Sequence, residues 1–275
     1  MIEVKDRIPT YPGRVKLVPV QGQADTYDMV RADEPVEVGT PINKALFDSI
    51  TGTISDAVQA IDNKIFEMTQ RVEGRNLANG APFGLYENGV LVPYYKVRND
   101  YNGSGRVLAL RADITHIAVL YDQNKYYYSQ NSADTWLNGE FLNRFDDATR
   151  NVLTGVSIDV IDTQGLWSIY RTVFLLSLEE YSVYGVAQTL GQGNGMFTTN
   201  GNRVATYNGS PTAYHTRDTS PAYRTSGVID AEGGGWLLSN LTTAGIRPAF
   251  TLPPTFEVVA GRPKAANTMA TAEVV

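Results

Sequence analysis

Side chains that could catalyse a reaction are few in this sequence and lie far apart along it. The chain has two histidines, His116 and His215, and no cysteine. Thiolate nucleophiles, disulfides, zinc–thiolate sites and iron–sulfur clusters are therefore excluded. His116 lies inside a strand pattern and is expected to be structural, and neither histidine has carboxylates at the spacing of a known ligand set. We therefore expect no catalytic residues, no metal site and no cofactor.

Two pairs of adjacent acids could suggest glycoside hydrolysis. They are Asp146-Asp147 and Glu179-Glu180. A glycosidase needs two carboxyl groups that face each other across a cleft. Each pair instead stands at an expected helix start, where carboxylates interact favourably with the helix dipole, and Ser177 to Glu180 has the form of a capping box. A glycan hydrolase that uses Asp218 or Asp230 remains the less favoured alternative.

Two glycine-rich segments resemble catalytic or phosphate-binding loops only in part. Gly191-Gln-Gly-Asn-Gly195 lacks the Lys-Ser/Thr of a Walker loop, and its third glycine falls one residue early for a dinucleotide fingerprint. Gly103-Ser-Gly105 is one residue short on each side of a nucleophile elbow. Neither segment predicts an enzyme.

The most distinctive stretch is polar and runs from Thr198 to Trp236. Between Thr198 and Ser226 there is no Leu, Ile, Phe, Met or Trp. Tyrosine set among Asn, Ser and Gly is typical of binding loops, although a flexible connector would have a similar composition. We expect the 198–240 loop face to bind a ligand through Tyr207, Asn208, Tyr214, His215, Arg217, Asp218, Tyr223, Arg224, Trp236 and Asn240.

Arginine and aromatic residues of this stretch suit a carbohydrate. Arg217 and Arg224 could pair with acidic or hydroxyl-bearing glycans, and the tyrosines could stack on sugar rings. For Trp236 the alternative is packing in the core, after the glycines at 233–235. Arg247 lies at the end of an expected strand, where a structural role is favoured over a ligand contact.

Charge and composition limit the partners. The net charge is -6 and the pI is about 5.0, which disfavours nucleic acid and anionic membranes. No run of about 18 apolar residues predicts a membrane span, and the N-terminus lacks the apolar run of a signal peptide. A protein of this kind that acts outside its producing cell would leave by lysis or within a particle.

A long amphipathic helix is predicted from about Thr40-Pro41 to Val72. Large apolar residues recur every seven positions at Phe47, Ile54, Ile61 and Met68. This spacing is typical of a coiled-coil stalk of about four heptads. A helix lying on its own domain's core would show the same pattern. A partner helix is favoured because the neighbouring segment supplies few apolar residues, and we expect the four named residues to mediate oligomerisation.

The remaining chain divides around this helix. Residues 1–45 are turn-rich and predict an extended attachment arm, and residues 46–73 form the oligomerisation helix. Residues 74–259 alternate strand patterns, hairpin turns such as Asn88-Gly89 and short helices, which predicts an α+β domain with a mainly antiparallel sheet. Residues 260–275 are small and polar and are expected to form a flexible tail.

Several segments resemble those of a known class of protein. The arm from Arg7-Ile-Pro-Thr-Tyr-Pro-Gly to Gly39-Thr-Pro-Ile-Asn-Lys resembles the N-termini of tail-fibre or baseplate-associated proteins of phages and phage-tail-like bacteriocins of Gram-positive bacteria. The pieces Thr135-Trp-Leu-Asn-Gly and Arg247-Pro-Ala-Phe resemble a domain frequent in such proteins. That domain is similar to the C-type-lectin-like and formylglycine-generating-enzyme-like group of folds. The stretch 214–221 departs from the Trp-x-Arg-Ser-Pro-like piece usual in that domain.

The resemblance implies a receptor-binding protein of a virion or phage-like particle. It would be a homo-oligomer, with a trimer favoured, and would attach to a baseplate or tail protein through residues 1–45. Its lectin-like domain would bind a host cell-surface glycan or protein. It would be assembled in the bacterial cytoplasm and released by lysis. Enzyme members of the wider group act through cysteines or metal, so their activity does not carry over to a chain without cysteine. The alternative from another class is a purely structural baseplate or tail adaptor.

Overall fold

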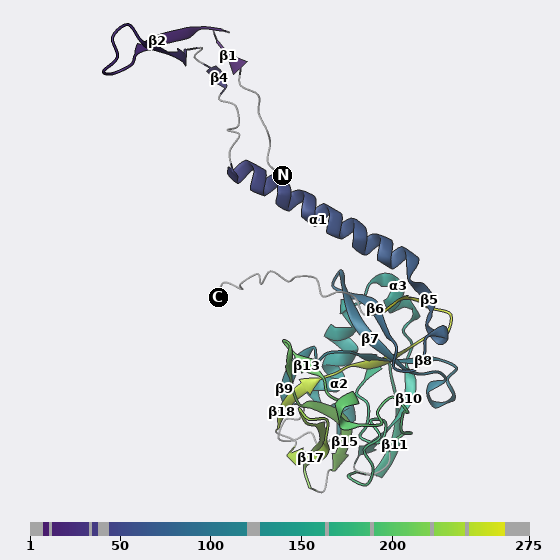
Figure 1. The fold of residues 1–275 in the computed structure, drawn as a ribbon. Helices are drawn as coiled ribbons and strands as arrows, with labels where there is room; N and C mark the ends of the chain where they lie inside the picture. Colours follow the sequence, from purple (N-terminus) through teal and green to yellow (C-terminus); the bar gives the residue numbers. More distant parts are fainter. Residues whose placement is uncertain are drawn as a thin grey trace. The chain divides into compact units, whose positions relative to one another are not determined.

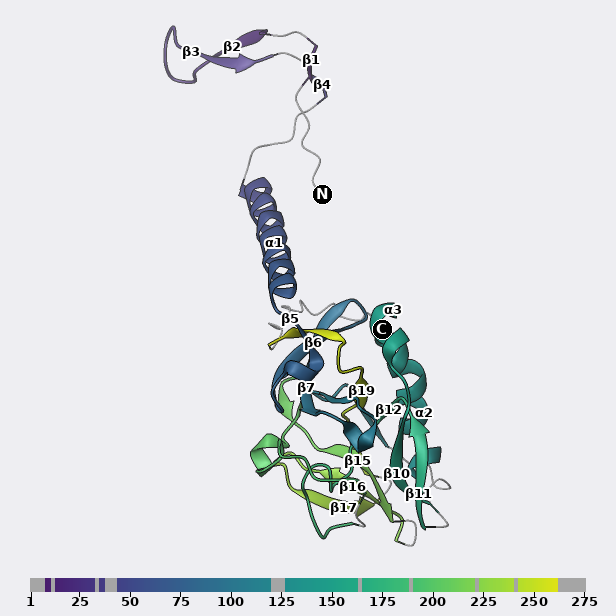
Figure 2. The ribbon, with the colours of Figure 1, turned by 90° about the vertical axis from the view of Figure 1, so that its right-hand side faces the viewer.

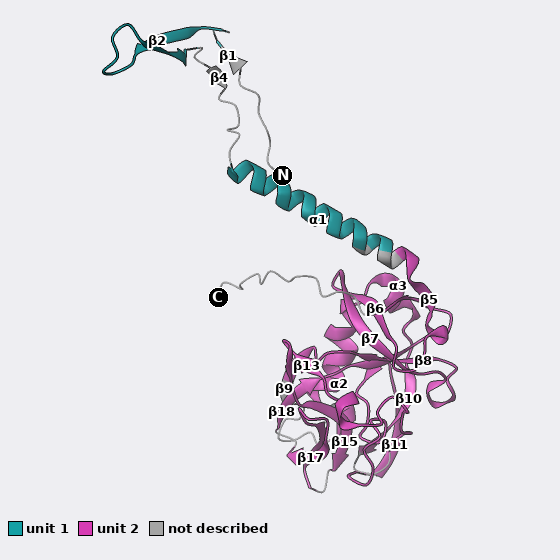
Figure 3. Cartoon of the chain, viewed as in Figure 1, with its two compact units in different colours: residues 1–66 teal, residues 67–275 magenta. Residues whose placement is uncertain are grey.

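The computed structural model divides the chain into two compact units, residues 1–66 and 67–275 (Figure 3). It describes residues 8–10, 13–32, 35–37, 44–119, 127–162, 165–187, 190–220, 223–239 and 242–261. Within these ranges the fold is α+β with mainly antiparallel sheets, as predicted. The expected tail is described only at residues 260 and 261, and Thr40 and Pro41 lie outside the described residues.

Unit 1 contains one long helix and two small ribbons. The helix α1 (Lys44–Thr69) carries the predicted apolar stripe. The strands β1 (Ile8–Pro9) and β4 (Pro35–Glu37) pair with each other, as do β2 (Val15–Pro19) and β3 (Tyr27–Arg31). The predicted helix extends to Val72, but Val72 pairs with Val258 in a sheet of unit 2, so the helix ends at Thr69.

A seven-stranded antiparallel sheet organises unit 2 (Figure 1). Its strand order is β12-β19-β8-β7-β6-β20-β5. Asn88-Gly89 makes the predicted turn between β6 and β7, and both residues have positive φ. The strands are β5 (Arg71–Glu73), β6 (Pro82–Glu87), β7 (Val90–Arg98), β8 (Val107–Arg111), β12 (Val173–Phe174), β19 (Ala249–Leu252) and β20 (Glu257–Ala260).

A five-stranded sheet with the order β17-β16-β15-β18-β9 forms the second part of unit 2. Only the pair β15–β18 is parallel. The strands are β9 (His116–Val119), β15 (Tyr214–Ser220), β16 (Thr225–Ile229), β17 (Gly235–Ser239) and β18 (Thr243–Ile246). Two separate hairpins, β10 (Val156–Asp162) with β11 (Gly165–Arg171) and β13 (Thr206–Tyr207) with β14 (Ser210–Pro211), complete the strands.

The two short helices α2 (Ser132–Trp136) and α3 (Asp147–Val152) follow each other along one side of the unit (Figure 2). Asn131 caps α2 by accepting a hydrogen bond from Asp134 N, and Asp146 caps α3 by accepting from Thr149 N. The role predicted for Asp146 is therefore confirmed. These bonds satisfy backbone donors that have no partner within a helix.

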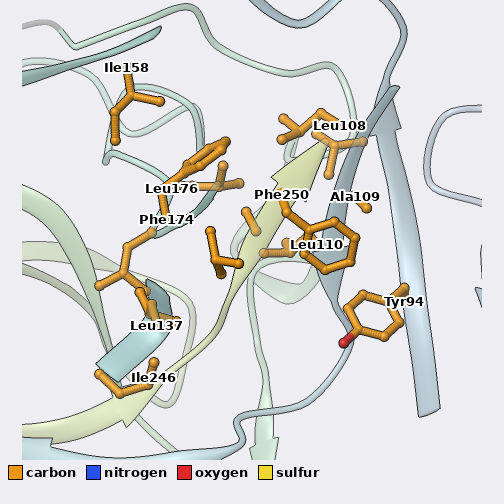
Figure 4. Close-up of a cluster of buried hydrophobic side chains, with 14 of the residues drawn as sticks. Tyr94, Leu108, Ala109, Leu110, Leu137, Ile158, Phe174, Leu176, Ile246 and Phe250 are labelled. Atoms are coloured by element: carbon orange, nitrogen blue, oxygen red, sulfur yellow. The ribbon is translucent and has the colours of Figure 1, made fainter. Parts of the chain in front are cut away.

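One apolar core joins the sheets, α2 and β10. Figure 4 shows Phe250 beside Leu108 to Leu110, with Leu137, Phe174 and Ile246 in the same cluster. The Trp-Leu-Asn-Gly and Arg-Pro-Ala-Phe segments both contribute to it through Leu137 and Phe250. These apolar contacts fix the position of the more polar elements around them.

Candidate functional site

The polar stretch predicted to form a binding loop contributes three strands to the five-stranded sheet. In β15, at the centre of that sheet, Tyr214, His215, Arg217 and Asp218 are at most 1% exposed. These side chains therefore lie inside the molecule and not on the predicted recognition surface. Composition alone did not show this, because polar side chains can be buried when internal partners take up their hydrogen bonds, as they do for Tyr214, Arg217 and one oxygen of Asp218.

The other predicted ligand residues do not form one face. Tyr223, Arg224, Trp236 and Asn208 are exposed, with Tyr223 82% exposed, and Tyr207 packs against the core. Asn208 precedes β15 and Tyr223 follows it, and a strand of that length spans about 20 Å. Trp236 Nε1 donates to Asp230 Oδ2 over 2.6 Å. Asn240 lies outside the described residues.

A buried ion pair joins Arg217 to Glu180. Their side chains are 0% and 1% exposed. Arg217 Nη1 contacts Glu180 Oε2, and Arg217 Nη2 donates to Glu180 Oε1 over 3.0 Å. Burial opposes the charge on Arg217, but the Glu180 carboxylate outweighs it, so the pKa of Arg217 is raised. Breaking such a pair would leave an uncompensated charge in the interior.

The same pair connects three separate segments. Tyr101 Oη donates to Glu180 Oε1 over 2.8 Å, and Ser177 N donates to Glu180 Oε2 over 3.0 Å. Arg217 Nε donates to the carbonyl of Asp159 over 2.9 Å. The capping box predicted at Ser177 forms its reciprocal bonds, since Glu180 N also donates to Ser177 Oγ. The segment makes a turn and not the predicted helix, because Ser182 has a positive φ of 56° and Glu180 is held by Arg217.

Asp218 lies beside this pair and is itself buried. Its Oδ2 accepts from Leu178 N and from Thr216 Oγ1, each over 2.6 Å. Its Oδ1 accepts no hydrogen bond from the described residues. Burial raises the pKa of Asp218 to about 6, and these hydrogen bonds only partly offset the effect. Asp218 therefore holds the turn at Leu178 and is not a surface ligand residue.

Arg247 and Arg203 form a second buried cluster. Arg247 Nε donates to the carbonyl of Arg111 over 2.9 Å, and Nη1 donates to Tyr214 Oη over 3.1 Å. Arg203 Nε donates to the carbonyl of Tyr181 over 2.6 Å. The structural role expected for Arg247 is therefore confirmed, and Arg203 is a further buried arginine that motif reasoning did not find.

A polar groove is lined in part by the segments around Tyr101 and Asp159, which the Arg217–Glu180 pair connects. It consists of two depressions of about 640 and 410 Å³ that share Arg98 and Gln192. The first is lined by Arg98, Asp100, Asn102, Gly103, Ser157, Asp159, Gly191 and Gln192. The second is lined by Asn79, Val97, Arg98, Asn99, Gln192, Gly193, Asn194 and Gly195. Almost every lining side chain is therefore polar.

Local backbone geometry shapes the groove. Asp100 and Asn102 have φ of 49° and 50°, in the left-handed region that non-glycine residues rarely adopt. Asp100 Oδ1 accepts from Gly105 N over 2.7 Å, and Asn102 Nδ2 donates to the carbonyl of Ser157 over 3.1 Å. These bonds offset the backbone strain, which costs on the order of 1 to 3 kcal/mol per residue.

Two segments with partial sequence motifs line this groove, but the motifs do not predict it. Gly103 and the segment from Gly191 to Gly195 line it, and the motifs in which they stand match neither a nucleophile elbow nor a phosphate-binding loop. Arg98, Asp100 and Asp159 gave no signal, because they come together only through the fold. A glycine-rich segment with asparagine is the one sequence feature that could have indicated a ligand surface here.

The described residues contain no group of three or more His, Asp or Glu side chains placed to hold a metal ion. Within those ranges no helix is long and apolar enough to cross a membrane. Asp218 and Asp230, the candidate acids of a hydrolase, are engaged separately, with Leu178 and with Trp236.

No curated protein and no solved structure matches this chain. A family model, described as "Domain of unknown function (DUF6273)", matches residues 104–254. The matched region includes the Arg217–Glu180 pair, the cluster of Arg247 and Arg203, and one wall of the polar groove. Because it covers more than half of the 275 residues, the chain belongs to the DUF6273 family.

Proposed function

We propose that this chain is a self-associating receptor-binding protein at the tail tip of a phage or phage-like contractile particle. In this proposal unit 1 joins copies and attaches them to a baseplate or tail protein, and unit 2 is the head that contacts a host cell-surface ligand, a glycan being favoured. The particle is assembled in the bacterial cytoplasm and released by lysis.

The observation that carries this proposal is the uncovered apolar stripe of α1. Phe47, Ile54, Ile61 and Met68 are between 58% and 71% exposed, and Ile50, Val58 and Ile65 beside them are also exposed. A stripe of this kind on a 26-residue helix is stabilised when partner helices cover it. The trimer rests on the resemblance and not on heptad detail, since Lys64 interrupts the second row of the stripe.

The ribbon β2–β3 supports an attachment role for residues 1–45. Its register places Val15, Leu17, Pro19, Tyr27 and Met29 on one face, and Leu17 and Met29 are exposed there. A two-stranded ribbon is marginally stable by itself in water. Contact with a particle protein would cover this face and stabilise the ribbon.

The finer fold assignment, a C-type-lectin-like head, belongs to the same proposal. The two segments on which that resemblance depends, 135–139 and 247–250, supply core residues of unit 2, and the domain is α+β as the resemblance implies. Four of the residues predicted as ligand contacts are buried, so in this proposal another part of the exposed polar surface of the head makes the contact.

The test combines molecular size with cell binding. The full chain and the double variant Ile54→Asp, Ile61→Asp are compared by sedimentation, with Ser55→Asp on the polar face as the matched control. We expect the chain and the control to form an oligomer and the double variant to be monomeric, with at least tenfold weaker binding to a panel of Gram-positive cells through lost avidity. A monomeric full chain that binds no cells would overturn the proposal.

The second candidate is a purely structural adaptor. The burial of Tyr214, His215, Arg217 and Asp218 favours it, because four of the ten predicted contact residues are then structural. An adaptor would be incorporated stoichiometrically into particles, yet the oligomeric chain would bind no cells. Release of sugars from purified wall polysaccharide would instead favour the hydrolase alternative.

A further inference from the structure

We infer that the polar groove binds a neutral, hydroxyl-rich oligosaccharide that extends through both of its depressions. This inference rests on the proposed role of unit 2 as a binding head, and it gives that head a ligand class and a site. None of the ten residues predicted as ligand contacts lines the described groove.

The groove offers hydrogen-bond acceptors and donors side by side. Asp159 Oδ1 accepts from Ser168 Oγ over 2.7 Å, which leaves Oδ2 available. Arg98 lines both depressions, and its side chain makes no hydrogen bond or ion pair with the described residues. A sugar hydroxyl can both donate and accept, so it satisfies a carboxylate and a guanidinium at the same site.

The charges that line the groove favour an uncharged ligand. The described lining contains two carboxylates, Asp100 and Asp159, and one arginine, and the whole chain carries a net charge of -6. A polyanionic ligand would meet net repulsion at this site. The amide groups of asparagine and glutamine that line the rest of the groove suit uncharged polar ligands.

Asn194 lines the second depression and has a buried acceptor without a partner in the described part of the chain. Asn194 is 4% exposed, and its Nδ2 donates to the carbonyl of Glu180 over 2.8 Å. This bond fixes the orientation of the amide, and Oδ1 then accepts no hydrogen bond from the described residues. A buried acceptor without a donor is costly, so a ligand hydroxyl that reaches Asn194 would gain binding energy from it.

Two exposed tyrosines flank the groove. Tyr170 lies directly opposite Ser157 in the β10–β11 ribbon and is 68% exposed. Tyr184 is 63% exposed, and its hydroxyl lies against Gly193, where it would collide with an added Cβ. Tyrosine presents an apolar ring and a polar tip, which matches the apolar faces and polar edges of sugar rings.

The site is also held in place before a ligand arrives. The Arg217–Glu180 pair holds Tyr101, which lies between Asp100 and Asn102, and it holds the backbone of Asp159. Glycine is required at 191, because an added Cβ would come within 2.7 Å of Glu180 Oε1. A preorganised groove loses little conformational entropy on binding.

The experiment is calorimetric titration of the full chain with four probes: maltotetraose, cellotetraose, mannotetraose and chitotetraose. Dextran sulfate serves as the polyanion. The groove variants are Asp159→Asn and Arg98→Gln, and the matched control is Asp147→Asn on α3, outside the groove.

We expect at least one tetrasaccharide to bind the chain and the control equally, each groove variant to bind it at least tenfold more weakly, and dextran sulfate not to bind. Thermal unfolding midpoints within 2 °C of the parent chain, roughly the shift that 1 kcal/mol causes at this size, would show that the variants are folded.

Each other outcome is decisive. Equal binding by both groove variants would place the sugar elsewhere, and binding of dextran sulfate alone would make the ligand class wrong. A chain that binds cells but none of the tetrasaccharides would overturn the inference while the proposed function stands. A chain that binds a tetrasaccharide through the groove but no cells would overturn the proposed function and leave the inference in place.

Discussion

At the residue scale, the interior of unit 2 depends on charges that are fully withdrawn from water. Arg217 and Glu180 hold each other, and Glu180 also accepts from Tyr101 and Ser177. Replacing both partners by apolar residues can be neutral in other proteins, whereas removing one partner is strongly destabilising. The pair is therefore a point where a small chemical change has a large effect.

Glu180→Gln tests this dependence. The amide keeps the shape of the carboxylate but leaves the Arg217 charge buried without an anion. We expect the free energy of unfolding to fall by about 3 to 5 kcal/mol, measured by urea denaturation at pH 7. Asp147→Asn removes the partner of Arg150 at the surface, where the acid is 84% exposed, and should cost less than about 1 kcal/mol. Equal losses in the two variants would contradict the assignment of a buried pair.

Because Asp218 is buried, we expect it to make the free energy of unfolding depend on pH with a sign opposite to that of most acids. Burial raises its pKa from 3.8 to about 6, so between these values the native state binds more protons than the unfolded state. The free energy of unfolding therefore falls as pH rises from 4 to 6. The difference of about 2 pKa units corresponds to roughly 3 kcal/mol.

Asp218→Asn cannot ionise and should lose this dependence. Relative to the parent chain, the variant should gain about 3 kcal/mol of unfolding free energy between pH 4 and pH 7. Urea denaturation of both chains at several pH values measures the difference, in which the other titrating groups cancel. A difference that stays constant with pH would show that Asp218 is not perturbed.

At the element scale, β15 and β16 are joined by an irregular register. Three residues of β15, Thr216 to Asp218, stand opposite Gly227 alone. A Cβ on Gly227 would collide with Thr216 Oγ1 and lie 2.9 Å from Asp218 Cβ. The bulge turns Arg217 and Asp218 towards the partners described above, and Gly227 provides the space for it.

Gly227→Ala should therefore destabilise the chain by roughly 1 to 3 kcal/mol or more, because the added methyl group overpacks the bulge. Gly139→Ala is the matched control. It meets no atom within 4 Å in a helical segment, and it should be neutral or stabilise by up to about 1 kcal/mol. Thermal unfolding of both variants measures these changes in stability. A Gly227→Ala variant as stable as the parent chain would contradict the prediction and show that the bulge can relax.

Elements with a clear apolar period could be predicted from sequence, and polar strands could not. The stripe from Phe47 to Met68 and the Asn88-Gly89 hairpin appear in the structure as expected. β15 was missed because His215, Arg217 and Asp218 carry no apolar alternation, and their burial depends on Glu180 and Leu178 far away in sequence. The groove was missed for the same reason, since Arg98 and Asp159 meet only in the fold.

At the scale of the whole molecule, unit 2 begins before residue 74, where the sequence predicted the α+β domain to start. β5 precedes Gly74, and Val72 pairs with Val258. A chain that starts at residue 67 should thus fold as a monomer with the thermal midpoint of unit 2 in the full chain. A chain that starts at residue 74 lacks β5 and should unfold at least several degrees lower, since a loss of 1 kcal/mol shifts the midpoint by about 2 to 4 °C at this size. Equal midpoints would show that β5 does not stabilise the unit.

The pairing of β5 with β20 also determines how unit 2 can be connected to other chains. β5 opens the unit, β20 closes its described part, and Arg71 at the start of β5 stands directly opposite Val259 near the end of β20. Entry and exit therefore lie side by side at one border of the seven-stranded sheet. A domain whose ends lie close together can be inserted into a surface loop of another protein without straining either junction. We therefore expect unit 2 to fold when it is inserted into such a loop.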